Sequence, residues 1–277
     1  MNNGYLKENF VQTDAGKIFY YSQTPFPGQP TIIFLHGLSS NHSTWNFAVG
    51  AAEKMGFNFL ALDLRGHGHS DKSKKRNLYQ IPIFAHDLQE VITKENINQI
   101  ILVGYSFGGQ IALDYALRYP TKIKKLVLIS TNHVNPLRYK HLNFLTWPAY
   151  GAVNLLAWLF LWQKRKKYYY FDQAKDSGYW RSTLKGYLTM PLSVNFWLLA
   201  QTAHLDFRHN LDKIACPTLL IRSQSDPFLS QKEVNDMKQK IKLSETAVIN
   251  EPSHFLASRH QEKTMEIISE FLKEKIS

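Results

Sequence analysis

The sequence has a single cysteine, Cys216, among its 277 residues. No disulfide can therefore form within the chain, which excludes the class of small secreted domains that disulfides hold together. Residues 1–8 also lack the apolar stretch and the small-residue cleavage site of a secretory signal peptide. We therefore expect the protein to act in the cytoplasm, where thiols stay reduced; a secreted protein without disulfides is the alternative.

Acidic residues are scarce, with 22 Asp and Glu against 33 Lys and Arg, which gives a formal net charge of +11. Such an excess can attract nucleic acid, anionic lipid or an acidic substrate, or it can belong to an ordinary lysine-rich solvated surface. The sequence has no zinc-finger spacing and no aromatic-basic RNA motif, so we expect no nucleic-acid partner. The hydrophobic content of 44% suits a globular protein with a substantial core.

Apolar runs alternate with helical patterns along most of the chain. Residues 10–23 predict a β-hairpin that opens the fold. The remaining predicted strands lie at 31–35, 57–62, 99–103, 125–129, 217–222 and 246–249, and the predicted helices near 45–55, 81–95, 107–119, 231–240 and 258–275. Continuous apolar strands separated by helices indicate a parallel sheet covered on both faces, so the predicted fold class is α/β.

One segment, residues 133–210, breaks this alternation because it holds many aromatic side chains and no clear strand. We interpret it as a helical cap inserted into a core that consists of residues 1–132 and 211–277. An insertion after a central strand lies over the carboxyl ends of the strands, where open α/β sheets bind ligands. The predicted cap therefore covers the predicted site.

A serine stands in the sequence GYSFGG at residues 104–109, directly after an apolar strand and before a helical pattern. This is the context of a G-x-S-x-G nucleophile elbow, in which glycines permit a strand-to-helix turn too tight for side chains. The helix N-terminus behind the serine favours developing negative charge. We therefore expect Ser106 to be a nucleophile, although a glycine-rich turn capped by a serine would have the same short motif.

Two residues after strand ends can activate this serine. His254 follows the last predicted strand, so its ring can reach the carboxyl edge of the sheet as a general base. Asp226 follows the strand at 217–222, whereas residues 130–132 after the preceding strand include no acid. We therefore expect Asp226 to orient His254, and the order Ser, Asp, His favours this role over that of a simple turn initiator.

The loop after residues 31–35 begins His36-Gly37-Leu38. The glycine lets the backbone approach a reacting carbonyl, and the expected oxyanion donors are the backbone N–H groups of Leu38 and Phe107. We expect His36 to pin the loop. A second polar segment, residues 63–70, holds an aspartate and two histidines but lacks the further ligands of a metal site, so we expect it to stabilise a turn and bind no metal.

These pieces resemble the α/β-hydrolase fold superfamily over nearly the whole chain. The residues that carry the resemblance are, in family order, His36-Gly37, 63–70, 104–109, Asp226 and His254. The resemblance implies a mostly parallel eight-stranded sheet, a cap inserted after the sixth strand, and no cofactor. Relatives similar in motif are esterases, monoacylglycerol-type lipases, enol-lactone hydrolases and carbon–carbon bond hydrolases. Dehalogenases and epoxide hydrolases are similar but have aspartate in place of Ser106, so the serine argues against them.

The segment between Leu142 and Trp162 contains no Asp, Glu, Lys or Arg. Its length would suit a transmembrane helix, but spanning would put the two halves of the sheet on opposite sides of a membrane, so we exclude it. In a first interpretation, residues 155–162 form a helix buried between cap and core that lines an apolar pocket. We expect Tyr105, Trp158 and Trp162 to contact the substrate.

In a second interpretation, part of this uncharged stretch faces a lipid interface. A basic run at 164–167 and three tyrosines at 168–170 follow it at once. Basic and aromatic residues together favour a membrane surface, which predicts peripheral contact with an anionic membrane. The ordinary alternative for the basic run is a solvated face.

The predicted activity is hydrolysis of a carboxylic ester with an apolar acyl or aromatic group, through an acyl-enzyme on Ser106. The same triad also serves thioesterases, lactone hydrolases and carbon–carbon bond hydrolases. It can also persist in a receptor or binding protein that turns over slowly or not at all. The sequence leaves the physiological substrate and the oligomeric state open.

Overall fold

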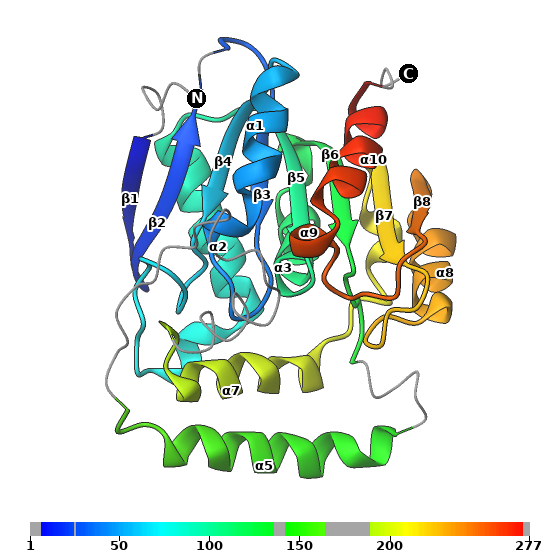
Figure 1. The fold of residues 1–277 in the computed structure, drawn as a ribbon. Helices are drawn as coiled ribbons and strands as arrows, with labels where there is room; N and C mark the ends of the chain where they lie inside the picture. Colours follow the sequence, from blue (N-terminus) through cyan, green and yellow to red (C-terminus); the bar gives the residue numbers. More distant parts are fainter. Residues whose placement is uncertain (1–6, 25, 136–141, 164–188, 274–277) are drawn as a thin grey trace.

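An eight-stranded sheet with the strand order β1-β2-β4-β3-β5-β6-β7-β8 forms the centre of the molecule (Figure 1). The computed structural model describes residues 7–24, 26–135, 142–163 and 189–273. The strands are β1 (Lys7–Thr13), β2 (Gly16–Gln23), β3 (Thr31–Leu35), β4 (Asn58–Leu62), β5 (Ile100–Tyr105), β6 (Ile123–Ile129), β7 (Thr218–Ser223) and β8 (Ser244–Ile249). The β1–β2 and β2–β4 pairs are antiparallel and all other neighbours are parallel. The predicted mostly parallel sheet is confirmed.

Helices cover both faces of this sheet. The described α-helices of the chain are α1 (Asn46–Lys54), α2 (Ile81–Lys94), α3 (Phe107–Arg118), α5 (Thr146–Leu159), α7 (Leu192–Gln201), α8 (Gln231–Lys240), α9 (Leu256–Arg259) and α10 (Gln261–Lys273). Helices α1 and α10 pack on one face, and α2, α3 and α8 pack on the other (Figure 1). Each face has its own apolar core, with Phe84 and Ile111 in one and Ala48 and Ile268 in the other.

The burial of the strands follows from this two-sided cover. Every residue of β3, β4, β5 and β7 is buried, which explains why the middle of each strand is an apolar run without alternation. In the edge strand β8, Ile249 is the only buried residue. The predicted closing helix at 258–275 is divided in the structure, because α9 ends at Arg259 and α10 begins at Gln261.

The chain between β6 and β7 supplies α5 and α7, which lie beyond the carboxyl ends of the parallel strands (Figure 1). Helix α7 joins the core with Val194, Trp197 and Leu198, and α5 packs on the outer side of α7. An antiparallel bridge between Val134 and Asp206 holds the two ends of this segment together. That it acts as a separate cap domain stays a prediction. Residues 136–141 and 164–188 within it, which include the basic run at 164–167 and the tyrosines at 168–170, lie outside the described residues.

Helix α5 overturns the first interpretation of residues 155–162. Leu155, Trp158 and Trp162 are 57%, 65% and 76% exposed, and Ala157 is the one buried residue of this stretch. The prediction of a buried helix is wrong because an apolar sequence without a polar face does not say which side packs. Only the side of α5 that faces α7 packs against the protein. None of the helices that the structure describes has both the length and the apolar character needed to cross a bilayer.

Candidate active site

Ser106 stands at the turn between β5 and α3, with the backbone angles φ 51° and ψ −113°. This left-handed conformation is strained for a residue with a side chain and persists only where the surroundings enforce it. The neighbouring glycines do so. A Cβ on Gly104 would lie 2.6 Å from the Cα of Gly109, and one on Gly108 would overlap the backbone of Leu35. The structure therefore has the elbow that the sequence predicts.

The turn brings Ser106 to the two residues predicted to activate it. The Nε2 atom of His254 lies 3.1 Å from Ser106 Oγ, and its Nδ1 atom lies 2.9 Å from each carboxylate oxygen of Asp226. Because an ionised carboxylate only accepts hydrogen bonds, Nδ1 carries the proton and Nε2 is left to accept from the serine hydroxyl. This arrangement can withdraw a proton from Ser106 and hold it on an imidazolium beside a negative charge.

Backbone and side-chain contacts fix the carboxylate of Asp226. Its side chain is fully buried, and Oδ1 accepts hydrogen bonds from the N–H groups of Phe228 at 2.8 Å and Leu229 at 3.1 Å. The side-chain amide of Asn132, three residues beyond the end of β6, donates to the carbonyl of Phe228 at 2.8 Å and to Glu233 Oε1 at 2.9 Å. Asn132 thus ties the Asp226 loop to two neighbouring elements.

Sequence reasoning considered position 132 only as a place for an acid and missed this amide. It also missed Glu233, which is 2% exposed and forms a capping box with Ser230 at the start of α8. Burial raises the pKa of the Glu233 carboxyl. The S-x-x-E pattern at 230–233 is a sequence signal for this helix start, but its link to the Asp226 loop is visible only in three dimensions.

The loop after β3 lies directly against the nucleophile. A Cβ on Gly37 would stand 3.6 Å from Ser106 Cβ and 2.8 Å from the ring of Tyr105, so only glycine fits. Leu38 is partly buried next to it, and Phe107 is the first residue of α3. In the described part of the chain, the backbone N–H groups of Leu38 and Phe107 donate to no protein acceptor, which leaves both free for a ligand.

A contact with α7 holds the same loop. Ser39, with φ 59°, donates from Oγ to Asn195 Oδ1 at 2.5 Å, and its N–H donates to His67 Nε2 at 3.2 Å. Asn195 is 5% exposed, and its Nδ2 atom has no hydrogen-bond partner among the described residues. Asn195 was missed from the sequence because nothing in a helical apolar run marks one amide as a contact to residue 39.

The two buried histidines near this loop, His36 and His67, are neutral and hold the backbone through hydrogen bonds. His36 Nε2 accepts from the N–H of Leu64 at 3.0 Å, and His67 accepts from Ser39, so neither acceptor nitrogen carries a proton. Burial lowers the pKa of His36 to about 4 and that of His67 well below its usual range. The predicted structural role of His36 is confirmed. Asp63 stabilises the adjoining turn by accepting from the backbone of His42 and of His69.

The three residues predicted to contact substrate have different surroundings. Tyr105 is 6% exposed, its hydroxyl donates to the carbonyl of His254 at 3.3 Å, and its ring lies against Gly37. Trp158 and Trp162 instead face outward, and their role in substrate binding stays a prediction. Phe228, which the sequence did not single out, has its ring centroid 4.9 Å from that of His254 and is half exposed.

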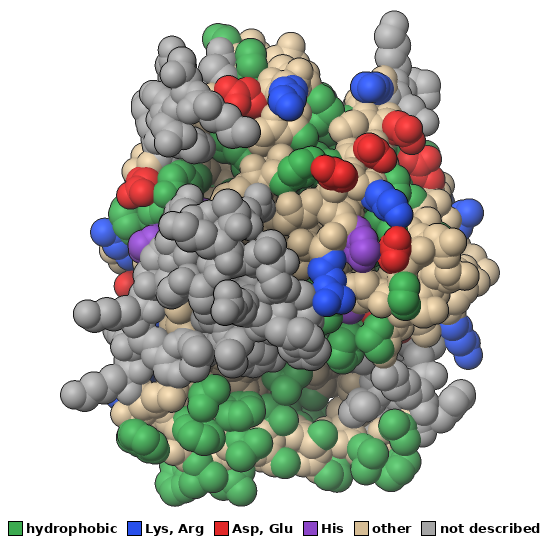
Figure 2. Space-filling model, in the orientation of Figure 1, with side chains coloured by type: hydrophobic (Ala, Val, Ile, Leu, Met, Phe, Trp, Pro, Cys, Tyr) green, Lys and Arg blue, Asp and Glu red, His purple; other side chains and the backbone are tan. Residues whose placement is uncertain are grey.

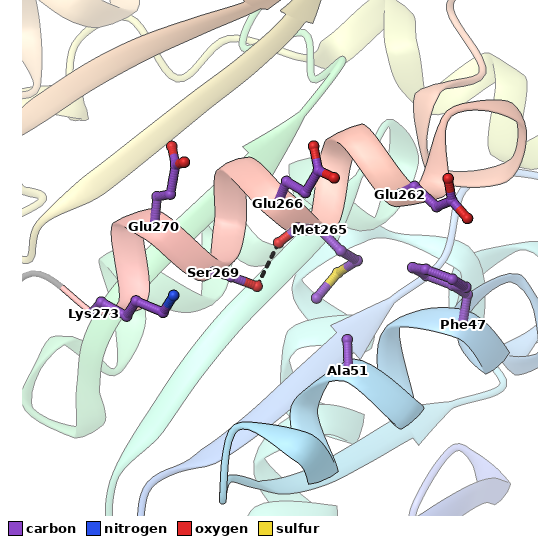
Figure 3. Close-up of a pocket in the computed structure, with 8 residues that line it drawn as sticks. All are labelled: Phe47, Ala51, Glu262, Met265, Glu266, Ser269, Glu270 and Lys273. Atoms are coloured by element: carbon purple, nitrogen blue, oxygen red, sulfur yellow. Dashed lines mark hydrogen bonds between the residues drawn. The ribbon is translucent and has the colours of Figure 1, made fainter.

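A groove between two helices lies apart from this site. Figure 3 shows a groove between α1 and α10 in which Phe47, Ala51 and Met265 lie between the two helices, and Glu262 and Glu266 line its edge. None of the residues that line it belongs to the Ser106 site. Over the described ranges, no three His, Cys, Asp or Glu side chains are grouped so that they could hold a metal ion.

Comparison with known proteins agrees with this geometry. Residues 30–190, more than half of the chain, match the family described as alpha/beta hydrolase fold. The chain therefore belongs to the alpha/beta hydrolase fold family.

Three relatives illustrate the breadth of the family. Epoxide hydrolase 3 of Xenopus tropicalis is 24% identical over 307 residues, which cover 98% of this chain and 78% of that protein. The solved esterase of Exiguobacterium antarcticum has a TM-score of 0.74 and 21% identity, with 97% of this chain and 100% of that chain covered. The enol-lactonase of Burkholderia xenovorans LB400 has a TM-score of 0.75 and 19% identity, with 96% and 100% covered. The fold and these relatives support a hydrolase.

Proposed function

We propose that this protein is a serine hydrolase that cleaves carboxylic esters with an apolar acyl or aromatic group. The observation that carries the proposal is the hydrogen-bonded chain of three side chains. Ser106 Oγ lies 3.1 Å from His254, and His254 lies 2.9 Å from Asp226. A nucleophile, a base within reach and a third group that orients the base are the parts that acyl transfer requires.

In the acylation step, His254 Nε2 takes the hydroxyl proton as Ser106 Oγ attacks the ester carbonyl carbon. The carbonyl oxygen becomes an oxyanion, and the backbone N–H groups of Leu38 and Phe107 donate to it. As the tetrahedral intermediate collapses, the C–O bond to the alcohol breaks and Nε2 returns its proton to the departing alkoxide. The alcohol leaves, and the acyl group stays on Ser106.

In the second step, water replaces the alcohol. His254 Nε2 accepts a proton from the water, whose oxygen attacks the acyl carbon, and the oxyanion forms between the same N–H donors. Collapse then breaks the bond to Ser106 Oγ, which recovers its proton from Nε2. The carboxylic acid leaves and the site is restored without a cofactor.

The nature of the nucleophile distinguishes ester from epoxide chemistry. Opening of an epoxide by Ser106 would form an ether, which the same histidine and water cannot cleave, so the enzyme would be consumed in one turnover. A carboxylate at this position would instead form an ester that water can release. The relatives named epoxide hydrolases therefore share the fold, while the serine favours acyl substrates.

The preference for an apolar substrate rests on the surroundings of His254. The ring of Phe228 lies 4.9 Å from it, that of Phe255 lies 5.5 Å from it, and Phe228 has half of its surface exposed. An exposed aromatic ring beside the reacting centre favours apolar groups on the substrate. We place this activity in the cytoplasm, since the single cysteine leaves the chain independent of disulfides.

A substrate panel tests the proposal. Nitrophenyl esters of increasing acyl length, an acyl thioester and a lactone are each supplied to the wild type and to Ser106→Ala. We expect ester turnover that Ser106→Ala lowers by at least about 10³-fold. Faster turnover of the thioester or lactone would assign the same site to those bonds. Fluorophosphonate labelling of Ser106 without turnover of any substrate would indicate a receptor or binding protein.

A further inference from the structure

The exposed apolar side chains are concentrated on one part of the surface. Of thirteen large apolar side chains exposed among the described residues, eight lie within 144–162. Figure 2 shows this apolar area along the edge of the molecule that α5 forms. We call these side chains the α5 surface. A contiguous apolar area of this kind marks a site of interaction, because scattered exposed residues would not gather on one helix.

The composition of the α5 surface is that of an interfacial helix. Helix α5 contains no Asp, Glu, Lys or Arg over its 14 residues. Trp147 near the start of α5 is 61% exposed, and Trp158 near its end is 65% exposed. Leu155, between the two tryptophans, is 57% exposed, and Leu159, directly after Trp158, is 47% exposed. Tryptophan side chains favour the boundary between hydrocarbon and water, where one part of the ring is apolar and its N–H is solvated.

Cations border this apolar surface. Lys74, Lys75 and Arg76 are consecutive and exposed. The guanidinium of Arg76 donates to the hydroxyl of Tyr150 on α5 and lies 5.4 Å from the centre of that ring. No carboxylate among the described residues pairs with any of the three cations. The contact with Tyr150 therefore places the positive charge of Arg76 beside the apolar helix, and Lys74 and Lys75 directly precede it in the chain.

We propose that the α5 surface, together with Lys74, Lys75 and Arg76, docks this protein on the surface of a bilayer that contains anionic phospholipid. The leucines and tryptophans enter the boundary of the acyl chains, and the cations meet the phosphate groups. Helix α5 lies along the bilayer plane, since its 14 residues pack lengthwise against α7.

Charge argues for lipid over a second copy of the chain. Two copies joined through this surface would bring both sets of cations together, and each copy has a net charge of +11. An anionic bilayer neutralises the same cations. The docking depends on the surface alone and not on the proposed hydrolysis, so the test uses Ser106→Ala protein throughout.

Vesicle co-sedimentation tests the docking, with the full chain, phosphatidylcholine vesicles, and vesicles that also contain phosphatidylglycerol. We expect binding to the anionic vesicles, weakened by salt, and little binding to phosphatidylcholine alone. Leu155→Gln/Leu159→Gln should weaken binding about tenfold or more, since two apolar contacts are lost. Lys74→Gln/Lys75→Gln should weaken it roughly thirtyfold.

Two matched variants serve as controls. Leu243→Gln/Val248→Gln removes exposed apolar side chains elsewhere, and Lys54→Gln/Lys238→Gln removes the same charge from α1 and α8. Both should bind within about threefold of the parent protein if the site is local. Equal losses in test and control variants would overturn the proposal. So would the absence of binding to anionic vesicles, or a dimer in light scattering that Leu155→Gln/Leu159→Gln dissociates.

Discussion

Replacement of Asp226 by asparagine removes the negative charge beside His254 while keeping the size of the side chain. The Asp226 carboxylate is fully buried, and both of its oxygens lie 2.9 Å from His254 Nδ1. Without it, the imidazolium that forms during attack loses its counter-charge. The asparagine amide can also donate a hydrogen bond to Nδ1, which would move the ring proton to Nε2. A protonated Nε2 can no longer accept a hydrogen bond from Ser106.

The expected loss in kcat is on the order of 10³ to 10⁴, or about 4 to 5.5 kcal/mol of transition-state stabilisation. Steady-state kinetics on a nitrophenyl ester measures it, and KM should change little because Asp226 does not touch the substrate. Fluorophosphonate labelling of Ser106 should slow by a similar factor.

A second aspartate–histidine pair provides the matched control. His133 Nε2 lies 2.8 Å from Asp236, on the helix α8, with Asp236 partly exposed. Asp236→Asn therefore removes a charge from an Asp–His pair outside the site and should leave kcat within about threefold of the wild type. Comparable losses in the two variants would refute the reasoning, as would Asp226→Asn protein with more than a tenth of the parental activity.

Gly104→Ala should abolish activity and lower stability by about 2 to 4 kcal/mol, because the added Cβ would overlap the backbone of residues 108 and 109. Gly151→Ala in α5 has open space around the added Cβ, so it should be neutral or should stabilise the protein by up to about 1 kcal/mol in thermal unfolding. Asn195→Ala should lower kcat about tenfold and lower stability in thermal unfolding by about 1 to 3 kcal/mol, since it releases Ser39 in the oxyanion loop and leaves its buried hydroxyl unpaired; unchanged kcat would show that the loop keeps its position without this contact. His36 has a pKa of about 4 in the folded chain and near 6.5 in the unfolded chain, so protonation of His36 favours unfolding. The stabilisation of about 3 kcal/mol that is present above pH 6.5 is therefore lost as the pH falls toward 4. Chemical denaturation of the wild type between pH 7 and pH 5 should show this decline, and His36→Gln should flatten it.

The sequence predicts the sheet well because its strands are buried on both faces. Runs such as Ile100–Tyr105 are apolar throughout, and the helices between them have clear periodicity. The candidate triad was predictable for a related reason, since each of its members follows a strand end and parallel strands end at one edge. Ser106, Asp226 and His254 share this edge because β5, β7 and β8 lie in the same parallel part of the sheet.

The parts that were not predictable depend on contacts between distant segments. The amide of Asn132 acts through Phe228, and that of Asn195 acts through Ser39, 156 residues away along the chain. No local pattern specifies such pairs. The exposed face of α5 was misjudged for a different reason, because an uncharged helix has no polar side to show which face meets solvent.

The formation of an acyl-enzyme on Ser106 tests the central claim most directly. A nitrophenyl ester is mixed with the protein, and the reaction is quenched in acid within the first turnovers. The protein is then digested, and the masses of its peptides are measured by mass spectrometry. The account predicts an added acyl group on the peptide that contains Ser106, and neither adduct nor turnover in Ser106→Ala. Undiminished ester turnover in Ser106→Ala, or an acyl group on a different residue, would contradict it.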